Sequence, residues 1–186
     1  PVFCAASILT NTATAWVNQI TAGRTVTLGV TSIQGGEAPN VIPDTADILG
    51  SLRFFNDEEG EKAVRIFKNV AEHTAAMNNC QVQFDDRFCV LCAPVINDEY
   101  YSNLISAALP EVLLENVTVS SCEPWYASES FSCYRRICPS VLAHLGINNP
   151  SYGSGAAHHN GFFDVDEGVL STGVIATLKF VAMLQK

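Results

Sequence analysis

The amino-acid sequence predicts an α/β fold in two parts, and three observations carry this prediction. Apolar residues recur with helical spacing in some segments and alternate with polar residues in others, so both helices and strands are expected. Apolar residues make up 48% of the 186 residues and charged residues 16%, which is enough to build a core. The pattern changes near residue 88, where shorter elements begin. We therefore expect one domain over 1–88 and a second segment over 89–186.

The first half of the first part is predicted to contain one helix and two strands. Apolar residues at helical spacing predict a helix over 5–20, and Gly23 follows as a stop signal. Residues 25–33 and 45–55 alternate between apolar and polar side chains, which is typical of half-buried strands. The expected core face of the helix consists of Leu9, Ala13, Trp16, Val17 and Ile20.

A second helix and a third strand complete the first part. Asn56 is a suitable N-cap, with Glu59 three residues later in a box-like arrangement, and the helix should end near Asn78. Residues 80–87 alternate again and predict a strand whose Val82 points inward. A strand before residue 1 would complete a βαββαβ unit of ferredoxin-like type, with both helices on one face of an antiparallel sheet.

The second part is predicted to alternate strands and helices, as in a piece of an α/β layer. Residues 147–161 are rich in Asn, Gly and Ser and indicate a loop. The predicted elements are helices at 99–109 and 129–137, strands at 117–120 and 141–145, and a last helix from Asp164 or Asp166 to the end.

Charge and apolar content exclude some classes of protein. The 10 Lys and Arg against 19 Asp and Glu give a formal charge of −9, whereas a nucleic-acid-binding module needs a basic face. We found no apolar run near the roughly 20 residues that span a membrane, and no signal segment at the start. The seven cysteines are scattered and odd in number. We therefore expect a cytoplasmic protein with reduced thiols, without a nucleic-acid or membrane partner.

Two adjacent histidines, His158 and His159, lie in the Gly-rich loop. Imidazole is a common zinc ligand, but a metal site needs three or four ligands, and neighbouring residues rarely bind one ion. A solvent-exposed pair is the alternative interpretation.

A second candidate group joins the loop at 35–44 to the strand that follows it. Asn40 offers an amide N–H that could polarise a carbonyl, and Arg53 carries a fork that could hold a carboxylate. The alternative is a simple turn at Asn40 and an ion pair between Arg53 and Asp47 on one strand face.

Two further groups are weaker candidates. Glu129 could contact substrate, although Ser128 as N-cap and Glu129 in a first helical turn explain the same residues. Cys89 and Cys92 form one CxxC pair inside an apolar run, which favours packing thiols over a thiol-redox site.

In their order and spacing, five segments resemble the M20 metallopeptidase family, in particular its amidohydrolases of N-acyl amino acids, hippurate and auxin conjugates. Residues 35–44 (GGEAPNVIPD) with 49–53 (LGSLR) are similar to the signature of the lid domain. Residues 93–98 (APVIND) resemble the return into the catalytic domain. Residues 126–131 (YASESF) are similar to a Gly-Ser-Glu-Asp-Phe segment, and 157–167 (AHHNGFFDVDE) to a His-Ser-Pro-x-Phe-x-x-Asp-Glu segment.

The resemblance implies a lid, ferredoxin-like but lacking its first strand, followed by the C-terminal part of an α/β zinc-peptidase-like catalytic domain. It also implies a parent enzyme that hydrolyses the amide bond of N-acyl amino acids or small peptides. Two divalent ions, zinc or manganese, would activate a water in that enzyme, with a glutamate as general base. A homodimer formed through the lid is the expected assembly.

The resemblance assigns roles to four residues. His159 matches the late histidine metal ligand, while His158 stands where the family usually has an apolar residue. Asn40 matches the lid asparagine that holds substrate or oxyanion, and Arg53 matches the arginine that binds substrate carboxylate. Glu129 matches the acidic residue beside the active site.

Several departures leave a second interpretation open. Ala127 replaces Gly, Ser130 replaces Asp, and the residues after His159 are Asn-Gly instead of Ser-Pro. The family's Cys-Gly-His-Asp and paired-glutamate motifs are absent from the 186 residues. We therefore expect this chain alone to hold no metal stably and to be inactive. The alternative is a non-catalytic, truncated paralogue that serves dimerisation or ligand binding.

Overall fold

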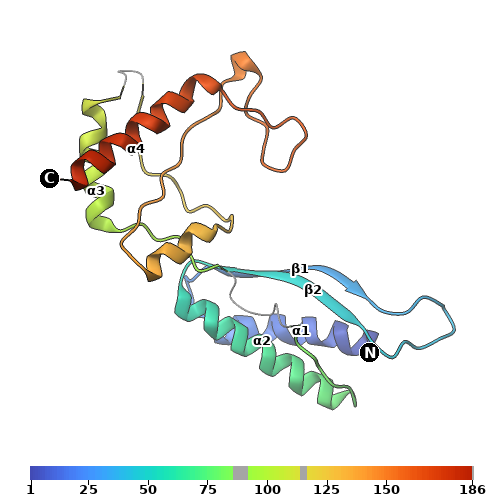
Figure 1. Ribbon diagram of the computed structural model, residues 1–186. Coiled ribbons are helices and arrows are strands. Elements are labelled where there is room, and N and C mark those ends of the chain that lie inside the picture. The colour runs from blue at the N-terminus through green and yellow to red at the C-terminus, as the bar shows by residue number, and fades with distance from the viewer. Residues whose placement is uncertain (86–91, 114–116, 186) are drawn as a thin grey trace. The chain divides into compact units, whose positions relative to one another are not determined.

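The computed structural model describes residues 1–85, 92–113 and 117–185 (Figure 1). The chain forms two compact units. Unit 1 comprises Pro1–Val95 and Tyr126–Cys133, and unit 2 comprises Ile96–Trp125 and Tyr134–Lys186. The predicted boundary between residues 88 and 89 lies outside the described residues. The predicted mixture of helices with an antiparallel sheet is confirmed.

Unit 1 contains the four regular elements that the sequence predicts before residue 80. Strands β1 and β2 pair antiparallel, with Val26 opposite Phe54 and a bulge between Val30 and Ser32. Figure 1 shows both helices on the same side of this two-stranded sheet. The elements are α1 (Val2–Gln19), β1 (Val26–Gln34), β2 (Asp47–Phe54) and α2 (Asp57–Met77).

The alternation in β2 places its side chains as predicted. Ile48, Leu52 and Phe54 are half-buried, whereas Asp47 and Arg53 on the other face are exposed. The half-buried face packs toward α2, and Ile48 joins the core between the helices. Arg53 is therefore available at the solvent face near the end of the strand.

Small side chains form the contact between α1 and α2. Cys4 and Ile8 of α1 pack with Ala71 and Ala75 of α2, which lets the two helices approach closely. The predicted core face of α1 is partly wrong, since Val17 is 86% exposed. The buried face of α1 is rotated by about one residue from the predicted face, because it packs against the small residues of α2. The buried residues of α1 are Cys4, Ala5, Ile8 and Thr12.

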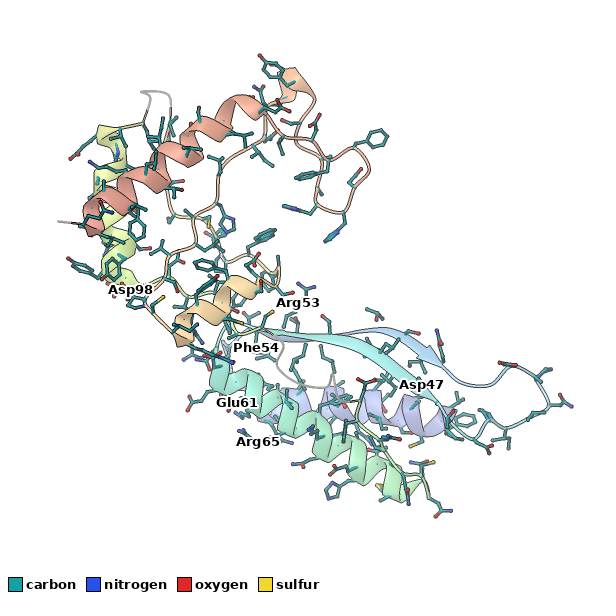
Figure 2. All side chains as sticks on the ribbon, viewed as in Figure 1. Asp47, Arg53, Phe54, Glu61, Arg65 and Asp98 are labelled. Carbon is teal, nitrogen blue, oxygen red and sulfur yellow. The ribbon has the colours of Figure 1, made fainter. Side chains whose placement is uncertain are left out.

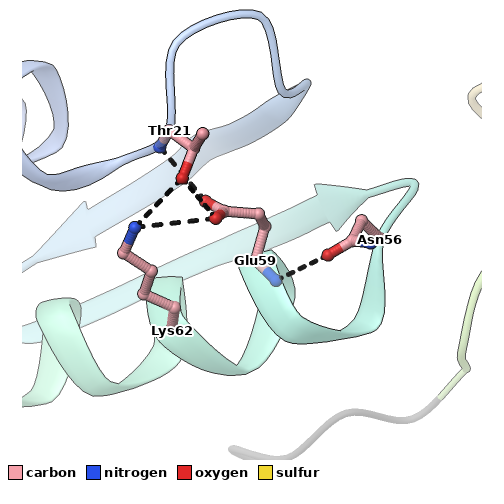
Figure 3. A network of polar contacts seen from close by, with 4 residues as sticks. All are labelled: Thr21, Asn56, Glu59 and Lys62. Carbon is pink, nitrogen blue, oxygen red and sulfur yellow. Dashed lines mark hydrogen bonds and ion pairs between the residues drawn. The ribbon is translucent and has the colours of Figure 1, made fainter.

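The N-terminus of α2 is tied to the turn after α1 by a polar network (Figure 3). Asn56 is the N-cap, as predicted, and its side chain accepts a hydrogen bond of 3.0 Å from the Glu59 N–H. The Glu59 side chain does not return to Asn56. It accepts hydrogen bonds from the N–H and hydroxyl of Thr21 at 3.2 and 2.5 Å, and lies 3.5 Å from the Lys62 ammonium. These contacts, led by the Thr21 hydroxyl, lower the pKa of Glu59.

The prediction of a third strand is wrong for residues 80–85, the part of it that the structure describes. Residues 80–85 join no ladder among the described residues, and 86–87 lie outside them. Val82 and Phe84 nevertheless pack against the core between the helices, as their alternation predicts. Alternation selects the inward side chains, but a strand also needs a hydrogen-bonded neighbour. The complete ferredoxin-like unit stays a prediction.

In unit 2, the sequence predicts the helices better than the strands. The expected strands at 117–120 and 141–145 are absent. The Asn97 side chain instead bonds both backbone groups of Leu142, at 2.8 and 2.9 Å, and the Asp98 N–H donates to the Ser140 carbonyl at 3.0 Å. These contacts satisfy both backbone groups of Leu142 and the Ser140 carbonyl without a ladder. The helices are α3 (Glu99–Ala108) and α4 (Leu170–Leu184).

The α4 region is apolar and exposed. By length and composition alone, residues Glu167–Leu184 could cross a membrane. From the sequence, no apolar run of this length was expected. None of this segment is buried within the described residues. The core helix of a folded domain has the same length and composition, so the segment alone does not indicate a membrane.

Candidate functional site

Arg53 is held at the end of β2 by the segment that contains Glu129. Its guanidinium Nη1 donates a hydrogen bond to the main-chain carbonyl of Tyr126. The Tyr126 ring packs edge-on against Phe55, with centroids 4.8 Å apart and planes at 81°. Both contacts lie within unit 1. The structure therefore brings Arg53 and residues 126–133 together, although they are far apart in the sequence.

The alternative ion pair between Arg53 and Asp47 is excluded. Asp47 is the first residue of β2, and Figure 2 shows the two side chains toward opposite ends of the strand. Six residues of a strand span about 20 Å, which is far beyond the reach of an ion pair.

Asn40 lies in the exposed loop that joins β1 to β2. Gly36 has a φ of +81°, a left-handed conformation that glycine adopts without strain. At Gly35 a Cβ would lie 3.0 Å from Val2 and 3.2 Å from Ala46, so a side chain at this position requires these neighbours to shift by a few tenths of an ångström. The loop enters β2 at Asp47, whereas Arg53 lies toward the other end of that strand (Figure 2). The structure does not bring Asn40 and Arg53 together within one chain.

Glu129 caps a short helix with its side chain. One of its carboxylate oxygens accepts hydrogen bonds from the Phe131 N–H at 3.1 Å and the Ser130 hydroxyl at 3.2 Å. The predicted helix at 129–137 is a 3₁₀ helix, η2 (Ser130–Arg136). The cap is thus made by Glu129 and not by Ser128, because the carboxylate reaches the N–H two residues ahead. Glu129 is exposed and in the same unit as Arg53.

His158 takes part in an aromatic cluster within unit 2. Its ring lies 5.1 Å from Trp125 and 5.3 Å from Phe163, centroid to centroid, and Trp125 also meets His144 edge-on at 5.2 Å. His158 is nevertheless exposed, as in the alternative interpretation of a solvent-exposed pair, so its ring contacts lie at the surface of the unit.

His159 differs from His158 in its backbone conformation. It is exposed, and its φ of +61° places it in the left-handed region, which histidine adopts more readily than most side chains. Within the described parts of the chain, no three His, Cys, Asp or Glu residues lie close enough to hold a metal ion. The described residues alone thus do not fit a metal centre, and His159 could supply one ligand of a larger set.

A network of hydrogen bonds joins the two ends of the loop that carries both histidines. The Asn149 side-chain amide donates to the Asp166 carboxylate at 2.6 Å, and the Asp166 N–H donates to the Ile147 carbonyl at 3.2 Å. The buried Ser154 hydroxyl accepts from the Asn149 N–H at 2.6 Å and lies 3.0 Å from the Ile147 carbonyl. These bonds hold the two ends of the loop together, so the position of the histidines depends on them.

Sequence reasoning missed Trp125 and Tyr126. Trp125 packs against His158, and the Tyr126 carbonyl accepts the hydrogen bond from Arg53. The available signal was an aromatic pair immediately before the Ser-Glu-Ser segment, since aromatic rings commonly pack against other rings.

A family model and several known proteins match parts of the chain. Residues 8–78 match the family model described as "Peptidase dimerisation domain" (M20_dimer). Among curated proteins, the chain is 28% identical over 147 residues to IAA-amino acid hydrolase ILR1-like 4 of Arabidopsis thaliana, covering 77% of this chain and 33% of that protein. It is 26% identical over 171 residues to N-acetylcysteine deacetylase of Bacillus subtilis, covering 92% and 42%.

A solved structure with a similar fold is the Bacillus subtilis YXEP protein, a dinuclear metal binding peptidase from the M20 family. The TM-score is 0.77 at 22% identity, over 99% of this chain and 46% of that one. A putative aminohydrolase from methicillin resistant Staphylococcus aureus gives 0.76 at 21% identity, over 97% and 45%. The chain spans a third to a half of the length of the proteins that it matches.

Proposed function

We propose that this chain, whose resemblance to the M20 metallopeptidase family is confirmed, is part of an amidohydrolase that cleaves N-acyl amino acids. The names of the relatives carry this proposal. They include an IAA-amino acid hydrolase, an N-acetylcysteine deacetylase and an N-acetyldiaminopimelate deacetylase. All three names join an acyl group to an amino acid, so the common reaction is hydrolysis of the amide between them.

Arg53 is the residue that we assign to the carboxylate of the substrate. It is exposed, and a guanidinium carries five N–H donors in a fixed fork, so the Tyr126 carbonyl does not exhaust it. A side chain already held in one orientation loses less entropy when it binds a planar anion.

Asn40 and Glu129 complete the proposed contacts. Glu129 presents a carboxylate oriented by the Phe131 N–H, in the same unit as Arg53. Asn40 would hold the substrate or the developing oxyanion. Because the hairpin separates Asn40 from Arg53, one chain does not present both to a single small substrate. A homodimer formed through the dimerisation domain is the arrangement in which different chains would supply them.

The proposed metal site extends beyond the described residues. We assign His159 as one ligand of two divalent ions, zinc or manganese, and the described residues do not complete that set. The exposed apolar face of α4 supports the same conclusion, since unit 2 needs further chain against it to bury that face. We therefore expect the 186 residues alone to be inactive. The parent protein is proposed to be cytoplasmic.

The second candidate function is a truncated paralogue without catalysis. Ala127, Ser130 and Gly161 depart from the pattern of the family and favour it. In that case the chain would dimerise or bind a ligand through unit 1 and would not hydrolyse amides.

Hydrolysis by the full-length protein tests the proposal. The protein, loaded with zinc or manganese, is offered N-acetyl amino acids and the matching N-acetyl amino-acid amides, which lack the free carboxylate. We expect release of free amino acid from the acids and at least about tenfold weaker kcat/KM for the amides. Binding of the acids without any release would favour the paralogue.

A further inference from the structure

Two cysteines that are far apart in the sequence meet in the core of unit 1. Cys4 lies in the first turn of α1, and Cys80 follows the end of α2. Cys4 belongs to the buried cluster with Ile8, Ala71 and Ala75, and Cys80 packs against that cluster. Both are free thiols.

The two thiols differ in exposure. The Cys4 residue is 6% exposed, whereas Cys80 is half-buried, and its Sγ donates to the Asn78 carbonyl at 3.4 Å. Burial first, and then the neighbouring Cys80 thiol, raise the pKa of Cys4 above its ordinary value. Cys80 is thus the thiol that a small oxidant reaches, and Cys4 is the partner behind it.

We propose that Cys4 and Cys80 are a dithiol site that small disulfides such as oxidised glutathione convert to an intramolecular disulfide. Residues 8–78 match the dimerisation domain, and Cys4 and Cys80 lie just outside the two ends of this range. The bond would therefore join the two ends of that domain and fix α1 against the end of α2.

The chemistry is two successive thiol–disulfide exchanges. The Cys80 thiolate attacks one sulfur of oxidised glutathione, forms a mixed disulfide and releases one glutathione thiolate. The Cys4 thiolate then attacks the Cys80 sulfur, the bond from Cys80 to glutathione breaks, and a second glutathione leaves. The two protons lost by the cysteines end on the two glutathiones. Two protein thiols are oxidised to one disulfide, and glutathione disulfide is reduced.

Peptide mapping of the oxidised chain tests the site. The protein is incubated with oxidised glutathione, remaining thiols are alkylated, and the protein is digested with trypsin. Cys4 and Cys80 then lie alone in the peptides 1–24 and 69–87. We expect these two peptides to be linked, with a loss of two hydrogens and with sensitivity to dithiothreitol.

Matched variants and a second readout keep the test decisive. Cys133→Ser, which removes an exposed cysteine, should leave the linkage unchanged. Cys4→Ser should leave glutathione on Cys80. Wild-type protein should also unfold at a higher temperature after oxidation than after reduction, because the bond restricts the unfolded chain. Wild-type protein in which Cys80 keeps its glutathione, stays unmodified or pairs with another cysteine would overturn the proposal.

Discussion

The Arg53 side chain is fixed by one main-chain carbonyl while it stays exposed. The sequence offered two partners for it, a substrate carboxylate and Asp47. The structure removes the second, because Asp47 lies at the other end of β2 (Figure 2). The observed partner, the Tyr126 carbonyl, is 73 positions away in the chain, and no local pattern predicts such a contact.

Replacement of Arg53 by alanine in the full-length protein should raise KM for N-acetyl amino acids. A charged hydrogen bond contributes about 1.5–3 kcal/mol, which corresponds to roughly a 10–100-fold change. Steady-state kinetics measure this, and Arg24→Ala is the control, since Arg24 is also exposed in unit 1. An unchanged KM for Arg53→Ala in a normally folded protein contradicts the assignment.

Gly60 is the residue at which α2 meets the ring of Phe54. A Cβ at this position would lie 2.6 Å from three ring atoms, closer than any real contact. Gly60→Ala should destabilise unit 1 by about 1–3 kcal/mol through overpacking, although alanine gains about 1 kcal/mol in helix propensity. Urea unfolding followed by fluorescence shows whether the net change in the free energy of unfolding is a loss, as we expect. Gly146→Ala, where a Cβ meets nothing within 4 Å, should leave the midpoint unchanged.

At the scale of the elements, Glu59 makes the stability of helix α2 depend on pH. The Thr21 contacts lower the pKa of this carboxyl in the folded protein, so the folded state binds the proton less tightly than the unfolded chain. The stabilisation is therefore complete above the pKa of the unfolded chain and is lost as the pH falls through the lower folded pKa.

Glu59→Gln should remove this part of the pH dependence. The wild-type unfolding midpoint should fall more steeply on acidification than that of the variant, as thermal unfolding at a series of pH values would show. Glu58→Gln, on the exposed side of the same helical turn, serves as control and should retain the wild-type slope. Equal slopes for wild type and Glu59→Gln would refute the role of the network.

The loop before α4 provides a second test on this scale. Asp166→Ala removes the bond to Asn149 and the cap on Gly168, and should cost about 1–3 kcal/mol of local stability. Hydrogen exchange should therefore become faster over residues 147–161. Glu167→Ala changes the neighbouring exposed carboxylate and should not alter the exchange. Unchanged protection in Asp166→Ala would show that other contacts hold the loop.

Across the whole chain, the sequence predicted elements that are stabilised locally. The helices at α1, α2, α3 and α4 follow from spacing and caps such as Asn56, and the β1–β2 hairpin from alternation and a Gly-rich turn. The strands predicted at 117–120 and 141–145 failed, because a strand depends on a partner that alternation does not specify. In their place, Asn97 pairs with Leu142 by a side chain.

The roles of the candidate site residues stay predictions, and the structure tests their placement. His159, Arg53 and Glu129 were selected by motif, and the structure places Arg53 and Glu129 in one unit. The order of the motifs along the chain carries no distance, so it did not predict that Asn40 lies at the other end of the hairpin from Arg53. It also missed the ring contacts of His158.

Unit 2 leaves an apolar face of α4 exposed within its described residues. Within its described residues, Ala108 is the buried apolar side chain, whereas many apolar residues of α4 are exposed. An exposed apolar face of this extent is typical of an interaction surface. The exposed apolar residues of α4 are Leu170, Val174, Ile175, Leu178, Val181 and Leu184.

The measurement that tests the central claim most directly is turnover of an N-acetyl amino acid by the full-length protein and by variants of its two adjacent histidines. If the chain belongs to a hydrolase and His159 is a metal ligand, His159→Ala should lower kcat by at least about 100-fold and reduce bound metal below the expected two ions per chain. His158→Ala, which removes the ring that packs on Trp125, should retain both ions and most of the activity. Near-normal turnover by a folded His159→Ala protein would contradict the account.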